Sequence, residues 1–106
     1  MPYADAVERA GHGKAQIARL VDRTISGSMG VGVAVYGAIT VEWKLPFDEV
    51  ITVIEGSMQV RSEGLTHLLE PGDVAWFPAE TPLTYIVEHR VVVSYAIYPI
   101  PQRAPA

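Results

Sequence analysis

The stretch Trp43–Gly56 reads WKLPFDEVITVIEG and decides how the chain folds. From Glu49 onward it is a run of β-branched and apolar residues that ends at a glycine, which is typical of a buried strand followed by a turn. An acidic residue at the start of a barrel strand can ligate a metal. Trp43 and Leu45, however, stand just upstream, where a metal needs nitrogen or oxygen donors. The stretch is therefore a metal site, a metal site whose donors have been replaced, or a site with another function.

Glycines divide the following sequence into short segments of even length. Gly56, Gly64 and Gly72 are each eight residues apart, which leaves room for one strand in each interval. We expect strands at residues 57–63, 65–71, 73–77, 83–88 and 91–98. Short strands at this spacing, with no helical segment between them, predict an all-β antiparallel sandwich or small barrel.

Two segments before the quoted stretch also alternate with a period of two. VGVAVYGAITVEW at 31–43 predicts one long half-buried strand, with Gly32 and Gly37 allowing a bend or bulge. QIARLVD at 16–22 sets Ile17, Arg19 and Val21 on one face. An exposed edge strand of this kind invites pairing with a second copy, so we expect a homodimer.

The chain divides into an N-terminal arm at 1–16, a β domain at 17–98 and a flexible proline-rich tail at 99–106. A short helical turn is possible at 5–10, where Gly11 and Gly13 would stop it. Prolines in the tail cannot donate to a central strand, so we expect it to be loose or draped on the surface.

Composition excludes several classes of function. The chain has 106 residues, a formal net charge of −4 and scattered basic residues, which argues against nucleic-acid and anionic-membrane surfaces. It has no cysteine, which excludes disulfides, zinc–thiolate sites and thiol nucleophiles. The first residues lack the apolar core of a signal peptide, and no apolar run is long enough to span a bilayer, so we expect a cytoplasmic protein.

Two spacings resemble the motifs of the cupins, which are small β-barrels of the jelly-roll, RmlC-like type. The first cupin motif matches Gly37, Trp43, Leu45, Glu49 and Gly56 in register. The second motif places Gly72, Pro78, Glu80, Leu83 and Val87 at its key positions. The resemblance implies an antiparallel jelly-roll barrel.

The same resemblance places Trp43, Leu45 and Leu83 at three of the four positions that ligate metal in cupins, and leaves Glu49 as the remaining donor. A transition metal typically needs at least three protein donors. We therefore expect no metal and no cofactor, and in place of a metal centre an apolar cup with one inward carboxylate.

Within the cupins, the chain resembles the EutQ-like proteins of ethanolamine utilization over residues 17–98. Three blocks carry the resemblance: SMGVGVAVY at 28–36, WKLPFDEVITVIEG at 43–56 and EPGDVAWFPAETPL at 70–83. In that group a tryptophan and a leucine likewise replace the histidines. The resemblance implies a link to bacterial microcompartments or to acetate kinase activity, although no phosphate-binding glycine loop of Walker type is present.

Glu49 is the first candidate for a functional residue. In an apolar cup, desolvation raises the pKa of a carboxyl, which would suit a general acid or base, or a hydrogen bond to a ligand amine or hydroxyl. The structural alternative is a rim carboxylate that accepts backbone or arginine hydrogen bonds. Asp48 is adjacent to Glu49, but neighbouring strand residues point to opposite faces, so a shared-proton pair is disfavoured.

Other candidates surround Glu49. Trp43 and Tyr85 suit either a ligand pocket or a core, because each is a large apolar ring with one polar tip. His67 shares its parity with Leu65 and Leu69, which predicts that it faces the barrel interior as a hydrogen-bonded core residue or as a ligand contact. The predicted ligand-binding set is Trp43, Leu45, Glu49, His67, Leu83 and Tyr85.

Three functions are open on these grounds. The first is a metal-free module that binds a small organic molecule. The second is a metal-independent enzyme, with acetate-kinase-like or isomerase-like chemistry that uses Glu49. The third is a structural component of a metabolic complex. The first is favoured, because no nucleophile–base pair is visible.

Overall fold

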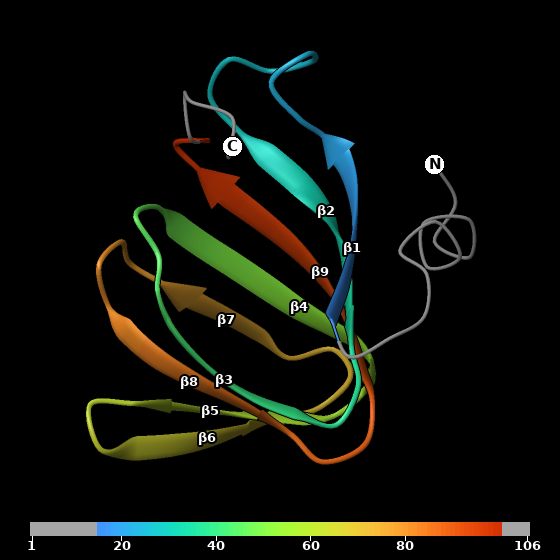
Figure 1. Cartoon of the computed structure of the whole chain (residues 1–106), viewed down its shortest axis with the longest axis vertical. Helices are drawn as coiled ribbons and strands as arrows, with labels where there is room; N and C mark the ends of the chain where they lie inside the picture. The colour runs from blue at the N-terminus through green and yellow to red at the C-terminus, as the bar shows by residue number, and fades with distance from the viewer. Residues whose placement is uncertain (1–14, 101–106) are drawn as a thin grey trace.

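The computed structural model describes residues 15–100, which form strands and turns with no helix, and hence no helix that could cross a membrane (Figure 1). The strands are β1 (Ala15–Val21), β2 (Gly30–Tyr36), β3 (Ile39–Lys44), β4 (Asp48–Gly56), β5 (Met58–Ser62), β6 (Leu65–Leu69), β7 (Val74–Phe77), β8 (Pro82–Val87) and β9 (Val91–Tyr98). The strands predicted from the glycine spacing are confirmed, with small shifts at their ends. The N-terminal residues 1–14 and the tail residues 101–106 lie outside the described residues, as does the helical turn predicted at 5–10.

The strands form two antiparallel sheets. The larger sheet has the order β1-β2-β9-β4-β7 and the smaller one β3-β8-β5-β6. Figure 1 shows the two sheets as facing layers that splay apart on the side where β1 lies. The all-β antiparallel prediction is confirmed. β1 is an edge strand, as predicted, while pairing with a second copy through it stays a prediction.

Side chains of both sheets meet in one apolar core. Ile51 and Val53 of β4, Val60 of β5, and Val91 and Val93 of β9 are each at most 2% exposed within it. A second cluster covers the opposite face of the larger sheet, formed by Ala18, Val33, Val35 and Val92. Strand β2 is therefore buried on both faces.

The segment 31–43 is two strands rather than the single predicted one. β2 ends at Tyr36 and β3 begins at Ile39, so the step between them carries the chain from the larger sheet to the smaller. In β2 the even-numbered side chains, such as Tyr36, face the core, whereas in β3 the odd-numbered Ile39 and Trp43 pack against it. The two-residue alternation continues through the corner in the sequence. The core-facing positions, however, change there from even-numbered to odd-numbered residues.

Because Gly32 has no side chain, the Tyr95 ring of β9 can lie over β2, the strand between β1 and β9. Gly32 pairs with Arg19 on one side and with Tyr95 on the other. A Cβ added at Gly32 would lie 2.6 Å from Tyr95 Oη and closer still to the Ala18 carbonyl oxygen. The Ala18 carbonyl and the Tyr95 ring therefore both require glycine at position 32.

The segment after β9 is held against the sheet at its start. Ile100, which the sequence places in a flexible tail, is 9% exposed. Its N–H donates to the Ser28 carbonyl at 2.7 Å. Packing against the larger sheet therefore continues past β9 to Ile100.

We expect Gly32→Ala to lower the free energy of unfolding by about 1–3 kcal/mol, because the methyl group overpacks a strand with no free space. Gly27→Ala is the matched control, since nothing lies within 4 Å of an added Cβ there. Guanidinium denaturation of both variants measures the difference. Equal stability of the two variants would show that Gly32 is not a packing requirement.

Candidate functional site

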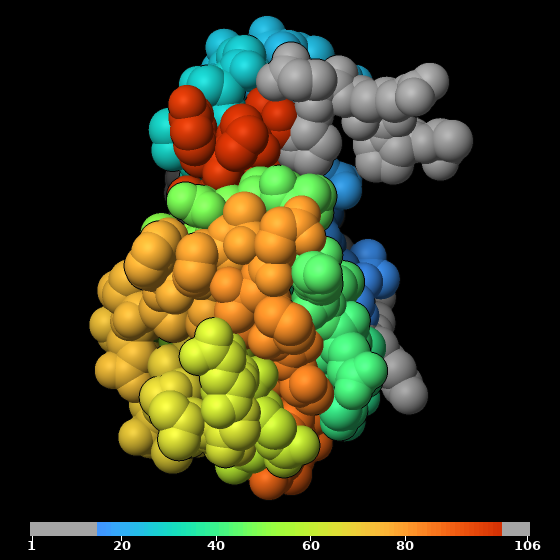
Figure 2. Space-filling model, turned by 90° about the vertical axis from the view of Figure 1, so that its left-hand side faces the viewer, coloured from blue at the N-terminus to red at the C-terminus, as the bar shows by residue number. Residues whose placement is uncertain are grey.

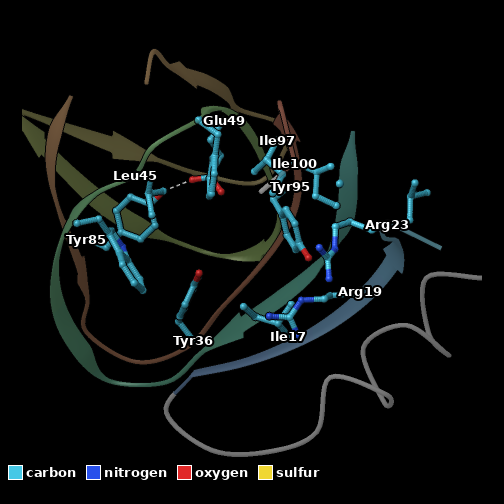
Figure 3. Close-up of a pocket in the computed structure, with 14 residues that line it drawn as sticks. Ile17, Arg19, Arg23, Tyr36, Leu45, Glu49, Tyr85, Tyr95, Ile97 and Ile100 are labelled. Carbon is cyan, nitrogen blue, oxygen red and sulfur yellow. Dashed lines mark hydrogen bonds between the residues drawn. The ribbon is translucent and has the colours of Figure 1, made fainter. Parts of the chain in front are cut away.

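A cavity of about 560 Å³ opens between the two sheets (Figure 3), which is within the range of small-molecule sites. It is bounded by β1, β2 and β9 on one side and by β3, β8 and the 45–47 loop on the other. The lining residues are Ile17, Arg19, Val21, Arg23, Gly30, Tyr36, Trp43, Leu45, Phe47, Glu49, Tyr85, Tyr95, Ile97 and Ile100. Most of this wall is apolar.

β2 presents small residues to the interior beside the cavity, and one of them, Gly30, lines it. The inward positions Gly30, Gly32 and Ala34 come before Tyr36 in the sequence GVGVAVY. At Gly30 an added Cβ would lie 2.9 Å from the side chain of Ile97, so the floor there is backbone and a neighbouring isoleucine. Larger residues at these positions would fill the space that the cavity occupies.

Glu49 and Tyr85 form the polar centre of the cavity. The Tyr85 hydroxyl donates to Glu49 Oε1 at 2.7 Å, drawn as the dashed line in Figure 3. Tyr85 is 3% exposed, and its ring is held edge-on by Trp43 at 5.9 Å and by Tyr36 at 6.1 Å between centroids. The hydrogen bond joins β4 of the larger sheet to β8 of the smaller one.

Burial is the main cause of the pKa shifts of Glu49, Tyr85 and Tyr36. Desolvation raises the pKa of Glu49 above its ordinary value of 4.5, and the Tyr85 hydrogen bond opposes that rise. Burial and the adjacent Glu49 charge raise the pKa of Tyr85, so its phenol stays protonated and acts as a donor. Burial, followed by the charge of Glu49, raises the pKa of Tyr36 to about 12. The cavity therefore holds a carboxyl among neutral phenols.

Asp48 and Glu49 have separate partners, as the strand geometry predicts. Asp48 Oδ1 accepts a hydrogen bond from the Ala79 N–H at 2.8 Å. The neighbouring Glu80 N–H donates to the Leu45 carbonyl at 2.8 Å, and Glu80 adopts φ = 66° at a position where the cupin motif has glycine. These bonds fix the 45–48 segment, which places Leu45 at the cavity and directs Glu49 inward.

The structure brings together four of the six predicted site residues: Trp43, Leu45, Glu49 and Tyr85 all line the cavity. Leu83 is 4% exposed and packs in the core, paired with Trp43 across β3 and β8, so it supports the wall without lining it.

His67 is a correction. It lies exposed on β6, outside the cavity, and the neighbouring Leu65 is 63% exposed. β6 is the outer strand of the smaller sheet, and Figure 2 shows the β5–β6 hairpin, in yellow, at the surface. His67 pairs with buried Val60 and so lies on the core side of β6, but among the described strands none pairs with the outer edge of β6, which leaves His67 exposed.

Four polar lining residues escaped the sequence prediction: Arg19, Arg23, Tyr36 and Tyr95. Arg19, Tyr36 and Tyr95 lie on strands of the larger sheet, and Arg23 follows one of these strands. None of the four stands at a cupin motif position. A charged residue within the apolar stripe of Ile17 and Val21 was the available signal for Arg19.

The donor set does not fit a metal ion. Among residues 15–100, no three histidine, cysteine, aspartate or glutamate side chains gather in a way that could hold one. Trp43 and Leu45 lie beside Glu49 in the cavity and supply no lone pair for a metal. The Trp43 Nε1–H is buried without a hydrogen-bond partner, and it is a donor rather than a ligand.

Comparison with known families and proteins gives one consistent result. The model of the family described as "Ethanolamine utilisation protein EutQ" matches residues 8–103. Acetate kinase EutQ of Salmonella typhimurium strain LT2 is 30% identical over 80 residues, which are 76% of this chain and 35% of that protein. The chain thus spans about a third of the length of the curated relatives it matches.

Solved structures agree on the fold. A putative ethanolamine utilization protein Q from S. typhimurium LT2 has a TM-score of 0.78 and 26% identity, over 89% of this chain and 76% of that one. An RmlC-like cupin from Shewanella frigidimarina has a TM-score of 0.73 at 14% identity, over 84% of this chain and 79% of that one. The cupin jelly-roll prediction is confirmed.

We expect the stability difference between Glu49→Gln and the wild type to grow as pH rises. A carboxyl with a raised pKa in the folded state stabilises that state below its unfolded value of 4.5, and this stability is lost as pH rises through the folded pKa. Glutamine is neutral throughout and keeps an oxygen acceptor for Tyr85. The free energy of unfolding of the variant relative to wild type should therefore rise from below pH 4.5 and level off above the folded pKa.

Guanidinium denaturation over a pH series measures this difference. Glu88→Gln, which removes an exposed carboxylate just after β8, provides the baseline. A difference that stays constant or falls with rising pH would contradict the burial of Glu49 in an apolar site.

Proposed function

The chain belongs to the EutQ family of ethanolamine utilisation proteins and has the cupin fold, and on this premise we propose that it binds a small organic molecule around Glu49 without a metal. One observation carries the proposal: the Tyr85 hydroxyl fixes Glu49 Oε1 at 2.7 Å inside an apolar cavity of about 560 Å³.

The second carboxylate oxygen of Glu49 is the group that a ligand would meet. Glu49 Oε2 has no hydrogen-bond partner among the described residues, while Oε1 is taken by Tyr85. A ligand hydroxyl or amine that reaches Oε2 from the cavity would donate a charge-assisted hydrogen bond to the carboxylate.

The walls fit the rest of such a molecule. Trp43, Leu45 and Phe47 offer apolar surface on one side, and Ile97 and Ile100 on the other. Burial of apolar ligand surface contributes about 25 cal/mol per Å² before the entropy of association is subtracted. Apolar contacts would therefore supply affinity, and Glu49 would set orientation.

A metal-independent enzyme is the second candidate, favoured by the same pair. Burial raises the pKa of Glu49 toward the range of general acids and bases, and Tyr85 orients the group. Proton transfer within a bound substrate, as in an isomerase, would need no further group. The relative from S. typhimurium is named an acetate kinase, but this chain matches 35% of it. Binding ranks first because no serine, threonine, lysine or histidine side chain lines the cavity in the described part of the chain.

We expect a thermal-shift screen of small amines, hydroxy compounds, carboxylates and sugars at millimolar concentration to give a stabilising ligand. For a confirmed ligand, Glu49→Gln should raise the Kd by about 10–100-fold, which corresponds to one hydrogen bond to a charged group. Glu88→Gln, the exposed control, should leave it unchanged.

Two outcomes would count against binding. A screen without any hit would favour a structural role in a metabolic complex. Turnover of a hit by wild type, lost in Glu49→Gln with binding retained, would favour the enzyme instead.

Elemental analysis of the purified protein tests the metal-free part separately. We expect iron, manganese, nickel and zinc each to be far below one equivalent, because the cavity offers one suitable donor side chain among the described residues. One bound equivalent that survives dialysis against a chelator would contradict the proposal.

A further inference from the structure

A second polar cluster lies in the cavity opposite Glu49. It consists of Arg19 on β1 and Tyr95 on β9, with Arg23 just beyond β1 on the same wall. Figure 3 shows the side chains of Arg19, Arg23 and Tyr95 on the wall across the cavity from the Glu49 carboxyl. Neither the cupin motif nor the Glu49–Tyr85 pair accounts for these side chains.

The strand register explains why the two groups meet. Arg19, Gly32 and Tyr95 lie in one row across β1, β2 and β9. The Tyr95 ring covers Gly32, with Oη 2.6 Å from the position of an added Cβ, so its hydroxyl points from β9 toward β1. The glycine gap in the middle strand thus lets Tyr95 reach the neighbourhood of Arg19.

The charge of Arg19 is directed at the cavity more than at any carboxylate of residues 15–100. Asp22, the acidic residue nearest in sequence, accepts hydrogen bonds from the Thr24 N–H at 2.9 Å and from the Thr24 hydroxyl at 2.5 Å. Those bonds lower the pKa of Asp22, and Arg19 is the weakest contributor. Burial raises the pKa of Tyr95 while the Arg19 guanidinium opposes the rise, as expected of a nearby cation.

Arg19 adds positive charge to the cavity that holds Glu49, in a protein whose net charge is −4. Arginine keeps its charge at any pH and binds carboxylate or phosphate oxygens through two parallel hydrogen bonds. A negatively charged group is the natural complement of this wall.

We propose that the ligand of this cavity is bipolar: its anionic end, a carboxylate or phosphate, binds the Arg19 guanidinium and the Tyr95 hydroxyl, and its other end donates a hydrogen bond to Glu49. This rests on the proposed function and names the ligand class for the same site. β1 and β4 are three strand positions apart, and Glu49 lies two residues along β4 from the row of Arg19, so their Cα atoms are separated by about 16 Å on a flat sheet. Both side chains reach inward from there, which leaves a gap that a short aliphatic chain spans.

Matched probe series test this directly by calorimetry: short ω-hydroxy carboxylates, ω-hydroxyalkyl phosphates, and α,ω-diols of the same chain lengths. We expect the anionic probes to bind at least about tenfold more tightly than the diols, and this advantage to shrink as salt rises from about 20 mM to about 500 mM. The carboxylate and phosphate series distinguish the two sources of the anion.

Arg19→Gln should remove the advantage of the anionic probes and leave the Kd of the diols unchanged, and Arg19→Lys should restore part of the advantage. Arg90→Gln is the matched control, because it removes the same charge from a position outside the cavity. Tyr95→Phe should weaken the anionic probes alone.

The outcomes separate the two levels of the proposal. Diols that bind as tightly as the anions, or an anion advantage that survives Arg19→Gln, would overturn the bipolar ligand and leave small-molecule binding standing. A cavity that binds none of the three series at millimolar concentration would contradict both.

Discussion

The hydrogen bond from Tyr85 to Glu49 is the interaction on which the rest of the site depends. It is the one polar contact that the structure shows between the two sheets inside the core of the described residues, at 2.7 Å. Edge-on rings from Tyr36 and Trp43 hold the Tyr85 side chain in place, so the carboxyl has a fixed direction. A desolvated carboxyl is costly, and a sheet-to-sheet hydrogen bond that offsets part of this cost is consistent with a role that requires the group.

Two glycines of β2 shape the wall opposite this pair. Gly30 lines the cavity, with the Ile97 side chain against it. Gly32 leaves room for the Tyr95 ring to lie across β2 toward β1, so the local sequence GVGVAVY positions the second polar wall. The cupin barrel keeps its shape without metal donors because its core is packed by Ile51, Val60 and Val93 rather than organised around an ion.

Much of the fold followed from periodicity and glycine spacing, since each glycine interval allowed one strand, and the two cupin spacings implied an antiparallel jelly-roll barrel. Glu49, Trp43, Leu45 and Tyr85 were found because they lie at or in phase with those motif positions. His67 was misplaced because parity assigns a face but not whether another strand covers it. Arg19 and Tyr95 were missed because they meet through Gly32, and the register across three strands is not visible in any one of them. The change of face between Tyr36 and Ile39 likewise depends on the turn between sheets.

The chain belongs to the EutQ family, while the proposed chemistry of the cavity rests on Glu49. Carbon-13 NMR titration of the Glu49 side-chain carboxyl, assigned by comparison with Glu49→Gln, tests this most directly. The account predicts a titration midpoint above the ordinary 4.5, because the group is buried in an apolar cavity. A midpoint at or below 4.5 would show a solvated carboxylate and would contradict the apolar cavity that the account requires.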